Sequence, residues 1–510
     1  MKSRLQLFFR SAERIGFLAA VMVSIPLIFR NAIIHDFPMG YAGLFTQMAK
    51  QVAEANFVLP AESPYYGPGG IPFAYPPFGL YLLAVFIKIT GKYFIFLRWL
   101  PPLFGLVSVC LTYLLAQKFF KLPFASMTAA ILAAASFDLH TAHISSSGIV
   151  RGLAFIFTIL FMIAYSSNPE LRTPRRLMVS SLFFGLAVLS HLAYGLFCFF
   201  WLAAASFSIR HWKKSLIDTV STGLGAGLLA SVWVLPVASL HGWDVFWGAL
   251  NSHGGNAFFV EAVSISGLIR LLYFNLTPLL SNPLLAGLVV IGIFYLLRHG
   301  YFRFVFFFLL VTLFFPENAR FVSWLGCFTA GYGLWSISDR LRGWGARFVN
   351  VPRFIWIVIV MFPALALLWL DGFSSVGRFT PLLTESALDL QAKRSEVFQD
   401  DGRYLALLIQ DEAEWMPFLL ELDPLVSQWG SEWLGDYDEQ TRLMSLFQTC
   451  RKEKDWACVN SALNETGAAP RFIITYRIEE KLNEQISADD AWAEIYANRR
   501  YIVWQVVEAR

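Results

Sequence analysis

Long apolar runs alternate with short polar segments over the first three quarters of the chain. A helix that crosses a bilayer needs about 20 mainly apolar residues. Eleven runs approach that length: residues 15–30, 97–117, 122–137, 149–166, 177–191, 193–209, 216–239, 280–297, 302–316, 321–337 and 354–371. No porin-like alternation of short strands is visible, so the spans are predicted to be helices. The pattern therefore predicts a polytopic α-helical membrane protein with about eleven spans.

Lysine and arginine gather in every second polar segment, and this predicts the orientation of the spans. These residues favour cytoplasmic loops, and they occur within residues 2–14, 118–121, 172–176, 210–214, 298–303 and 340–353. The N-terminus is then cytoplasmic. The first run is expected to stay as an uncleaved span, because no small-residue cleavage site follows it. The first outer loop covers residues 31–96, and everything after Asp371 lies on the extracytoplasmic side.

Residues 75–90 form one further apolar run whose assignment is decided by the basic loops. If this run were a span, every later basic loop would lie on the wrong side of the membrane. The run is also short and begins with Pro76 and Pro77, which suits the start of a helix. We therefore expect a helix that lies in, or dips into, the outer leaflet.

The chain changes character near residue 375, which predicts two domains. Residues 1–375 form the membrane module, and residues 376–510 carry frequent charges and only short apolar runs. In this second part, strands are expected at 403–409, 471–476 and 501–507, and helices at 437–452 and 478–498. Such alternation predicts a small extracytoplasmic α/β domain. Cys450 and Cys458 lie in it, and both a disulfide and two free thiols are open alternatives.

Composition and charge narrow the function classes. The chain has 510 residues, of which 56% are hydrophobic and only 15% are charged, whereas soluble proteins carry about 25% charged residues. The net charge of +4 comes from short clusters between apolar runs, which does not indicate a nucleic-acid partner. The span interiors are nearly free of ionisable residues, which weighs against ion-coupled transport. No phosphate-binding glycine loop of the P-loop type appears, so ATP-driven transport is also disfavoured.

Candidate chemistry gathers on the expected outer face, beginning with the stretch 34–41. There Asp36 follows His35 directly after the first span, and Phe37, Tyr41 and Phe45 follow it. A lone aspartate in such a place is commonly a helix cap or a solvated carboxylate. Aromatic surroundings at a membrane interface would instead raise its basicity, so that it could take a proton from a hydroxyl. Position alone does not choose between these two interpretations.

The layout resembles the GT-C superfamily of membrane glycosyltransferases. The resemblance rests on the basic N-terminal stub, one span, an acidic residue opening a long outer loop, and the run Tyr75-Pro76-Pro77-Phe78. It covers most of residues 1–370 in layout, and it extends to residues 415–418 and 430–433 in the tail. The superfamily includes protein O-mannosyltransferases, aminoarabinose transferases and oligosaccharyltransferase catalytic subunits.

This resemblance implies a reaction and roles for named residues. Asp36 would be the catalytic base or would orient the acceptor, and the donor would be a sugar on a polyprenyl phosphate. The phosphate would need cations on the outer face, for which Arg320, in the turn after Glu317, and Arg151 are the candidates. The alternative for either arginine is an interfacial anchor. Glu317, His35, Tyr75 and His143 are the further candidates for contact with the substrate or the lipid phosphate.

The second outer loop, near residues 138–150, contains Asp138, His140 and His143. Together with Asp36 or Glu317 these side chains could hold a divalent metal. No tight acidic pair of the oligosaccharyltransferase kind is present, so a hydrogen-bonding or substrate-lining role is favoured and no cofactor is assigned. Aminoarabinose transferases carry a lysine before the paired prolines, whereas this chain has Tyr75 there.

The resulting hypothesis is an inverting glycosyltransferase of a plasma or inner membrane, with no nucleic-acid partner. It would transfer a sugar from a polyprenyl-phosphate donor to a hydroxyl of a lipid, glycan or protein acceptor, at the surface of the surrounding membrane lipids. One alternative is oligosaccharyltransferase-type transfer to protein, and dependence of the activity on a divalent metal would favour it. The other is a non-catalytic component of polysaccharide assembly, or a flippase-like protein, which would tolerate the loss of Asp36.

Overall fold

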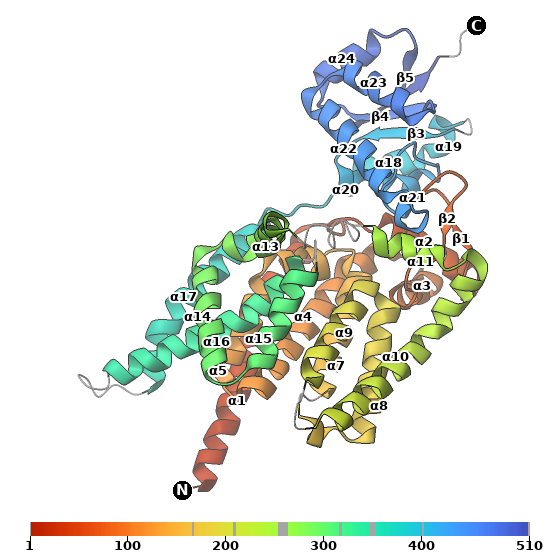
Figure 1. Cartoon of the computed structure of the whole chain (residues 1–510). Helices are drawn as coiled ribbons and strands as arrows, with labels where there is room; N and C mark the ends of the chain where they lie inside the picture. Colours follow the sequence, from red (N-terminus) through yellow and green to blue (C-terminus); the bar gives the residue numbers. More distant parts are fainter. Residues whose placement is uncertain are drawn as a thin grey trace.

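The structure is a computed structural model that describes residues 2–165, 168–207, 211–252, 264–315, 319–345, 353–399 and 402–507. A helical bundle forms one end of the molecule and the C-terminal domain the other, with the N-terminus projecting from the far end of the bundle (Figure 1). The bundle helices are α1 (Lys2–Ile34), α4 (Tyr93–Phe120), α5 (Pro123–Ala135), α7 (Gly148–Ala164), α8 (Pro174–Ser190), α9 (Leu192–Ser206), α10 (Trp212–His241), α14 (Pro283–Arg298), α15 (Phe302–Phe314), α16 (Ala319–Gly345) and α17 (Arg353–Gly377). Each of the eleven predicted runs therefore overlaps one of these helices.

Within the described ranges, three helical segments are both long and apolar enough to cross a membrane: Ser11–Ile34, Tyr93–Phe120 and Trp212–His241. A fourth arises if residues Phe137–Ile144 and Gly148–Ala164, which meet at 110°, count as one broken span. Shorter apolar helical segments include Pro123–Ala135, Leu192–Ser206, Pro283–Arg298 and Phe302–Leu313. These apolar helices make the chain an integral membrane protein. The number of eleven spans stays a prediction.

The bundle interior is packed with aromatic and small side chains. Trp201, Phe197 and Trp324 are fully buried in its largest core cluster. Helices α14 and α16 approach closely at Gly333, where an added Cβ would come within 2.3 Å of the Leu288 carbonyl oxygen. Small residues at such crossings let membrane helices pack by their backbones. On α10, by contrast, large apolar side chains such as Leu228 are exposed, as on a lipid-facing surface.

Short helices cover the end of the bundle that faces the C-terminal domain. These are α2 (Gly43–Glu54), α3 (Phe78–Thr90), α6 (Phe137–Leu139), a π-helical turn (His140–Ile144), α11 (Asp244–Asn251) and α13 (Ile265–Leu280). The predicted outer-leaflet helix at 75–90 corresponds to α3. Two short strands, β1 (Glu62–Ser63) and β2 (Ile71–Pro72), pair antiparallel in the first loop. The loops that the sequence places outside thus lie together at one end of the bundle.

The C-terminal domain has a mixed four-stranded sheet in the order β3-β4-β6-β5. Strand β3 (Tyr404–Leu407) is parallel to β4 (Phe472–Tyr476), while β6 (Tyr501–Val506) is antiparallel to both β4 and β5 (Trp492–Ala497). Its helices are α18 (Glu385–Ala392), α19 (Arg394–Val397), α20 (Gln410–Ala413), α21 (Met416–Leu420), α22 (Tyr437–Glu453), α23 (Trp456–Thr466) and α24 (Glu480–Ser487). A 3-10 turn, Ser431–Trp433, also belongs to this domain, and a second one, Pro169–Leu171, lies in the bundle.

Two predictions for this domain have definite outcomes. The helix predicted over 478–498 was too long: α24 ends at Ser487 and the chain returns as strand β5, whose Trp492 packs against Trp456 with ring centroids 6.0 Å apart. Packing on the sheet edge thus overrides the helical pattern. Cys450 and Cys458, left open between two states, form a disulfide with their Cα atoms 5.4 Å apart.

The domain docks on the first loop through backbone contacts. The indole Nε1 of Trp415 donates to the Gly40 carbonyl at 3.0 Å. The backbone amide of Ser146, in the second loop, donates to the Met39 carbonyl at 2.7 Å. Gly40 has φ +69, a conformation that favours glycine. The first loop, the second loop and the domain therefore meet at one point beside the bundle.

Candidate active site

A cavity of about 410 Å³ lies where these parts meet, and we call it the arginine cavity. Helices α7, α9 and α16 supply its bundle side, the first loop supplies another wall, and the domain covers it. Its polar and aromatic lining comprises Tyr41, Phe45, Tyr75, Arg151, His191, Ser252, Arg320, Glu414, Gln428, Trp429, Glu432, Trp433 and Tyr437. The chain thus brings residues more than 390 positions apart in sequence to a single enclosed space.

Two arginines give this cavity its charge. Arg151 lies in the first turn of α7 and Arg320 in the first turn of α16. The Arg151 guanidinium lies 5.4 Å from the ring of Tyr41, and that of Arg320 lies 5.4 Å from the ring of Tyr194. Among the described residues, neither arginine forms a salt bridge, and the Nε atom of each is buried without a hydrogen-bond partner. Two neighbouring cations without a carboxylate partner form a site for an anion.

A buried aromatic group supports Arg320 from behind. The His143 ring stacks on Phe155 with centroids 4.2 Å apart, and its Nε2 atom is hydrogen-bonded to the Tyr194 hydroxyl. Tyr194 in turn lies beneath Arg320. His143 therefore positions Tyr194, whose ring packs against Arg320. The His143 side chain does not itself line the cavity.

Aromatic rings form the opposite wall. Tyr75 packs with ring centroids 4.9 Å from Phe45, 5.8 Å from His191 and 6.1 Å from Trp433. These contacts fix the Tyr75 ring on the edge of the cavity, close to the charge of Arg151. Rings of this kind can pack against the apolar face of a sugar, while their polar ends donate hydrogen bonds.

Carboxylates come from the C-terminal domain. The buried Glu414 accepts hydrogen bonds from the amides of Gly43 at 2.7 Å and Leu44 at 2.8 Å, at the start of α2. Burial raises the pKa of Glu414 to about 8, against the opposing effect of these amides. Glu432 also lines the cavity, and its Oε2 accepts from the Gly430 amide at 2.8 Å. The cavity can therefore bind an anion, hold a sugar ring and move a proton at a carboxylate.

Asp36 and His35 lie outside this lining. The Asp36 side chain is 93% exposed, and its Oδ1 atom is 3.5 Å from Nη1 of Arg98. His35 is partly exposed beside it, where burial and the charges of Arg30 and Arg98 lower its pKa. Asp36 stands five residues before Tyr41, which does line the cavity. The structure thus brings Arg151, Arg320 and Tyr75 together, and leaves the first-loop carboxylate at the surface.

The second loop does not assemble the side chains that a metal site would need. The Asp138 carboxylate accepts a hydrogen bond from the Ser323 hydroxyl at 2.6 Å, whereas His140 is buried with its Nδ1 unpartnered. Across the part of the chain that the structure describes, no group of three or more His, Cys, Asp or Glu side chains is placed to hold a metal ion. Glu317 lies outside the described residues.

Sequence patterns did not single out Glu414, Glu432 or Tyr194. Glu414 belongs to a polar domain and reaches the cavity only through the docking of that domain on α2, a contact 370 positions apart in sequence. Tyr194 lies within an apolar run, where a tyrosine is ordinary core packing. A signal was present for the two glutamates: Trp415 and Trp433 adjoin them, in the tail segments on which the family resemblance rests.

Comparison with known proteins gives matches in sequence and in fold. The family described as dolichyl-phosphate-mannose-protein mannosyltransferase matches residues 74–239, which include Tyr75, Arg151 and His191. No curated protein sequence matches the chain. The archaeal oligosaccharyltransferase AglB from Archaeoglobus fulgidus, solved with an inhibitory peptide and a dolichol-phosphate, has a TM-score of 0.60 at 12% identity, with 97% of this chain and 74% of AglB covered.

ArnT from Cupriavidus metallidurans is a second structural relative. Its apo structure has a TM-score of 0.51 at 12% identity, covering 99% of this chain and 98% of ArnT. The structure of ArnT bound to undecaprenyl phosphate has a TM-score of 0.50 at 12% identity, covering 100% of this chain and 99% of ArnT. At such identities the likeness concerns the fold. The predicted resemblance is confirmed: the chain resembles the GT-C glycosyltransferases, in sequence over residues 74–239 and in fold over nearly its whole length.

Proposed function

We propose that this chain is a membrane glycosyltransferase that moves a sugar from a polyprenyl-phosphate carrier to an acceptor hydroxyl on the extracytoplasmic face. The observation that carries the proposal is the arginine cavity, where Arg151 and Arg320 lack a carboxylate partner within the described ranges. A lipid phosphate would supply the missing negative charge. The aromatic wall around Tyr75 would receive the sugar.

The reaction follows from this placement. The acceptor oxygen attacks the anomeric carbon, and the bond between that carbon and the phosphate oxygen breaks. The polyprenyl phosphate leaves with the electron pair, and the two arginines stabilise the charge that develops on it. A carboxylate takes the proton of the acceptor hydroxyl. One displacement at the anomeric carbon inverts its configuration.

Two carboxylates compete for the role of base. Asp36 is favoured by its place at the start of the first outer loop, as the GT-C resemblance implies. Glu432 is favoured by geometry, because it lines the arginine cavity. We assign the role to Asp36 and treat Glu432 as the second candidate. Glu414 is less suited, because both of its oxygens accept backbone hydrogen bonds at the start of α2.

The comparisons support the proposed donor. ArnT is known in complex with undecaprenyl phosphate and AglB in complex with a dolichol-phosphate, and this chain shares their fold. The family that matches residues 74–239 is described by a dolichyl-phosphate-linked sugar. Since all three involve a polyprenyl phosphate, we propose the same donor class here.

The test is sugar release from labelled polyprenyl-phosphate hexoses and pentoses by the purified full-length chain, with a cell-envelope extract as acceptor source. We expect turnover by the wild type and about a hundredfold loss in Arg151→Gln. Arg442→Gln is the matched control, because Arg442 lies on the surface of the C-terminal domain in contact with Glu439 and Glu465. Absence of wild-type turnover with every donor would favour a non-catalytic protein of polysaccharide assembly.

A protein acceptor is the second candidate, favoured by the peptide bound in the AglB structure. If it is correct, label should appear on added peptides. A loss of transfer after chelation, restored by a divalent cation, would support the oligosaccharyltransferase type. Transfer that resists chelation and appears only on lipid or glycan would exclude it.

A further inference from the structure

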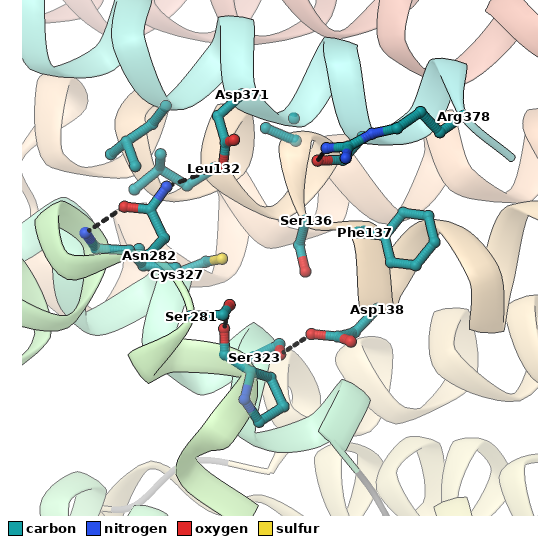
Figure 2. Close-up of a pocket in the computed structure, with 16 residues that line it drawn as sticks. Leu132, Ser136, Phe137, Asp138, Ser281, Asn282, Ser323, Cys327, Asp371 and Arg378 are labelled. Carbon is teal, nitrogen blue, oxygen red and sulfur yellow. Dashed lines mark hydrogen bonds between the residues drawn. The ribbon is translucent and has the colours of Figure 1, made fainter.

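A second cavity, of about 470 Å³, lies at the same end of the bundle, between the ends of α5, α13 and α17 and the beginnings of α14 and α16. We call it the carboxylate cavity. It is lined by Asp138, Asn282, Ser323, Asp371 and Arg378 together with three further serines, over apolar side chains such as Leu132 (Figure 2). Neither the family match nor the proposed phosphate site accounts for this lining.

Two hydrogen-bonded pairs define its polar surface. The Ser323 hydroxyl donates to Oδ2 of Asp138 at 2.6 Å, and Nδ2 of Asn282 donates to Oδ2 of Asp371 at 2.9 Å. Figure 2 shows these pairs on different sides of the cavity, with the Ser136 hydroxyl between them. Within the described part of the chain, Oδ1 of either aspartate takes no hydrogen bond from a side chain or backbone amide. Each carboxylate therefore keeps one oxygen free to accept a hydrogen bond from a ligand.

The charge of the lining selects the ligand class. Two carboxylates face one arginine, Arg378, which also donates to the Ser375 hydroxyl at 3.3 Å. Such a surface repels a phosphate, in contrast to the arginine cavity. It suits a molecule that donates several hydrogen bonds and carries no negative charge. A neutral saccharide fits, because its hydroxyls donate to carboxylates and its carbon–hydrogen faces pack on apolar side chains.

The two cavities flank one turn of α16. Arg320 lines the arginine cavity and Ser323 lines the carboxylate cavity. Side chains three positions apart on a helix have Cβ atoms roughly 5–6 Å apart. A ligand held at Ser323 and Asp138 would therefore lie within about one helical turn of the phosphate site.

We propose that the carboxylate cavity binds the saccharide part of the acceptor, with Asp138 and Asp371 accepting hydrogen bonds from its hydroxyls. That the ligand is the acceptor rests on the proposed function, whereas its saccharide character rests on the geometry of the carboxylate cavity alone. The donor and the acceptor would then lie side by side along the same turn of α16.

The test measures saccharide binding to the full-length chain in nanodiscs, by saturation-transfer NMR with a methyl hexoside and a methyl pentoside. We expect binding to the wild type and a loss of about tenfold or more in Asp371→Leu, since a hydrogen bond to a charged group is removed. Ser281→Trp, at the exposed rim, should abolish the signal by filling the cavity. Asp438→Leu, which replaces an exposed aspartate of the C-terminal domain, is the matched control.

Thermal stabilisation by undecaprenyl phosphate is measured in parallel on the same variants. It should be unchanged in Asp371→Leu and Ser281→Trp, which shows that both are folded, and lost in Arg151→Gln. Glycoside binding that is absent in the wild type, or equal in Asp371→Leu and wild type, overturns the saccharide proposal. A wild type that binds glycosides but gains no stability from undecaprenyl phosphate would instead count against the proposed function.

Discussion

The arginine cavity and the carboxylate cavity occupy the same end of one bundle, yet their linings have opposite character. The first combines two arginines that lack salt bridges among the described residues with a wall of aromatic rings. The second has two aspartates with open oxygens and several hydroxyls. A difference of three residues along α16 separates them. The contrast teaches that a small shift along one helix turn can separate a lining rich in arginine from one rich in aspartate.

The largest expected effect concerns a residue that lines neither cavity. Asp36→Asn should lower sugar transfer by about a thousandfold, because a positioned base typically contributes about 10²–10⁴ in rate. Its thermal stability should stay near that of the wild type, because the side chain is exposed. Initial rates and melting curves of Asp36→Asn and Glu432→Gln are compared. Loss of activity in Glu432→Gln alone would move the role of base to the cavity wall.

Next in size is the difference between two arginines, one from each cavity. Arg320→Gln should reduce sugar release about a hundredfold, because it removes a donor to the leaving phosphate. Arg378→Gln should reduce hydrolytic release by less than about threefold, since that arginine does not contact the phosphate in our proposal. Both are measured as release to water, without acceptor. Equal losses of sugar release in the two variants would contradict the proposal that only the arginine cavity binds the phosphate.

A smaller effect is expected on the pH dependence of stability, and it concerns Glu414, which lines the arginine cavity but not the carboxylate cavity. Glu414 has its pKa raised from 4.5 to about 8 in the folded chain, so the folded state binds more protons than the unfolded state between these values. Stability from this group is therefore present at low pH and lost as pH rises toward and through about 8. We expect the melting temperature to fall over that range in the wild type.

Glu414→Gln cannot ionise and should flatten that pH dependence, at the cost of a lower melting temperature at neutral pH. The reason is that an amide NH2 group, which cannot accept, replaces one of the two carboxyl oxygens that accept from the amides of Gly43 and Leu44. Melting curves at several pH values, in one detergent, make the comparison. An unchanged slope in the variant would mean that another group controls the wild-type response.

The smallest effect on activity is expected from the disulfide. Cys450 and Cys458 are eight positions apart, so the loop entropy of their bond contributes about 2.5 kcal/mol. The double replacement Cys450→Ser, Cys458→Ser should lower the unfolding free energy of the C-terminal domain by about that amount. Sugar release should stay within about twofold, since neither cysteine lines the arginine cavity or the carboxylate cavity. Denaturant titration checks the first value and initial rates check the second.

Periodicity and charge predicted the membrane bundle, because a helix in lipid must satisfy its own backbone and therefore needs a continuous apolar run. Arg151 and Arg320 were proposed as phosphate ligands because the GT-C resemblance implies a lipid phosphate on the outer face, where the sequence places these two arginines. The partners of these residues could not be predicted in the same way. Glu414 reaches α2 by domain docking, and Asp371 reaches Asn282 by helix packing, and neither contact leaves a local pattern.

The contact between the C-terminal domain and the first loop engages main-chain atoms, at Gly40, Gly43 and Leu44. Only glycine fits at residue 43, since an added Cβ would lie 2.6 Å from the Glu414 carbonyl oxygen. Two loop side chains add further bonds to the domain: the Tyr66 hydroxyl donates to the Glu414 carbonyl at 3.1 Å, and Nζ of Lys50 donates to Oε1 of Glu421 at 3.1 Å. A foreign loop grafted at this place should therefore remain compatible with the domain if it keeps the two glycines, Tyr66 and Lys50, while the other loop positions are open to change.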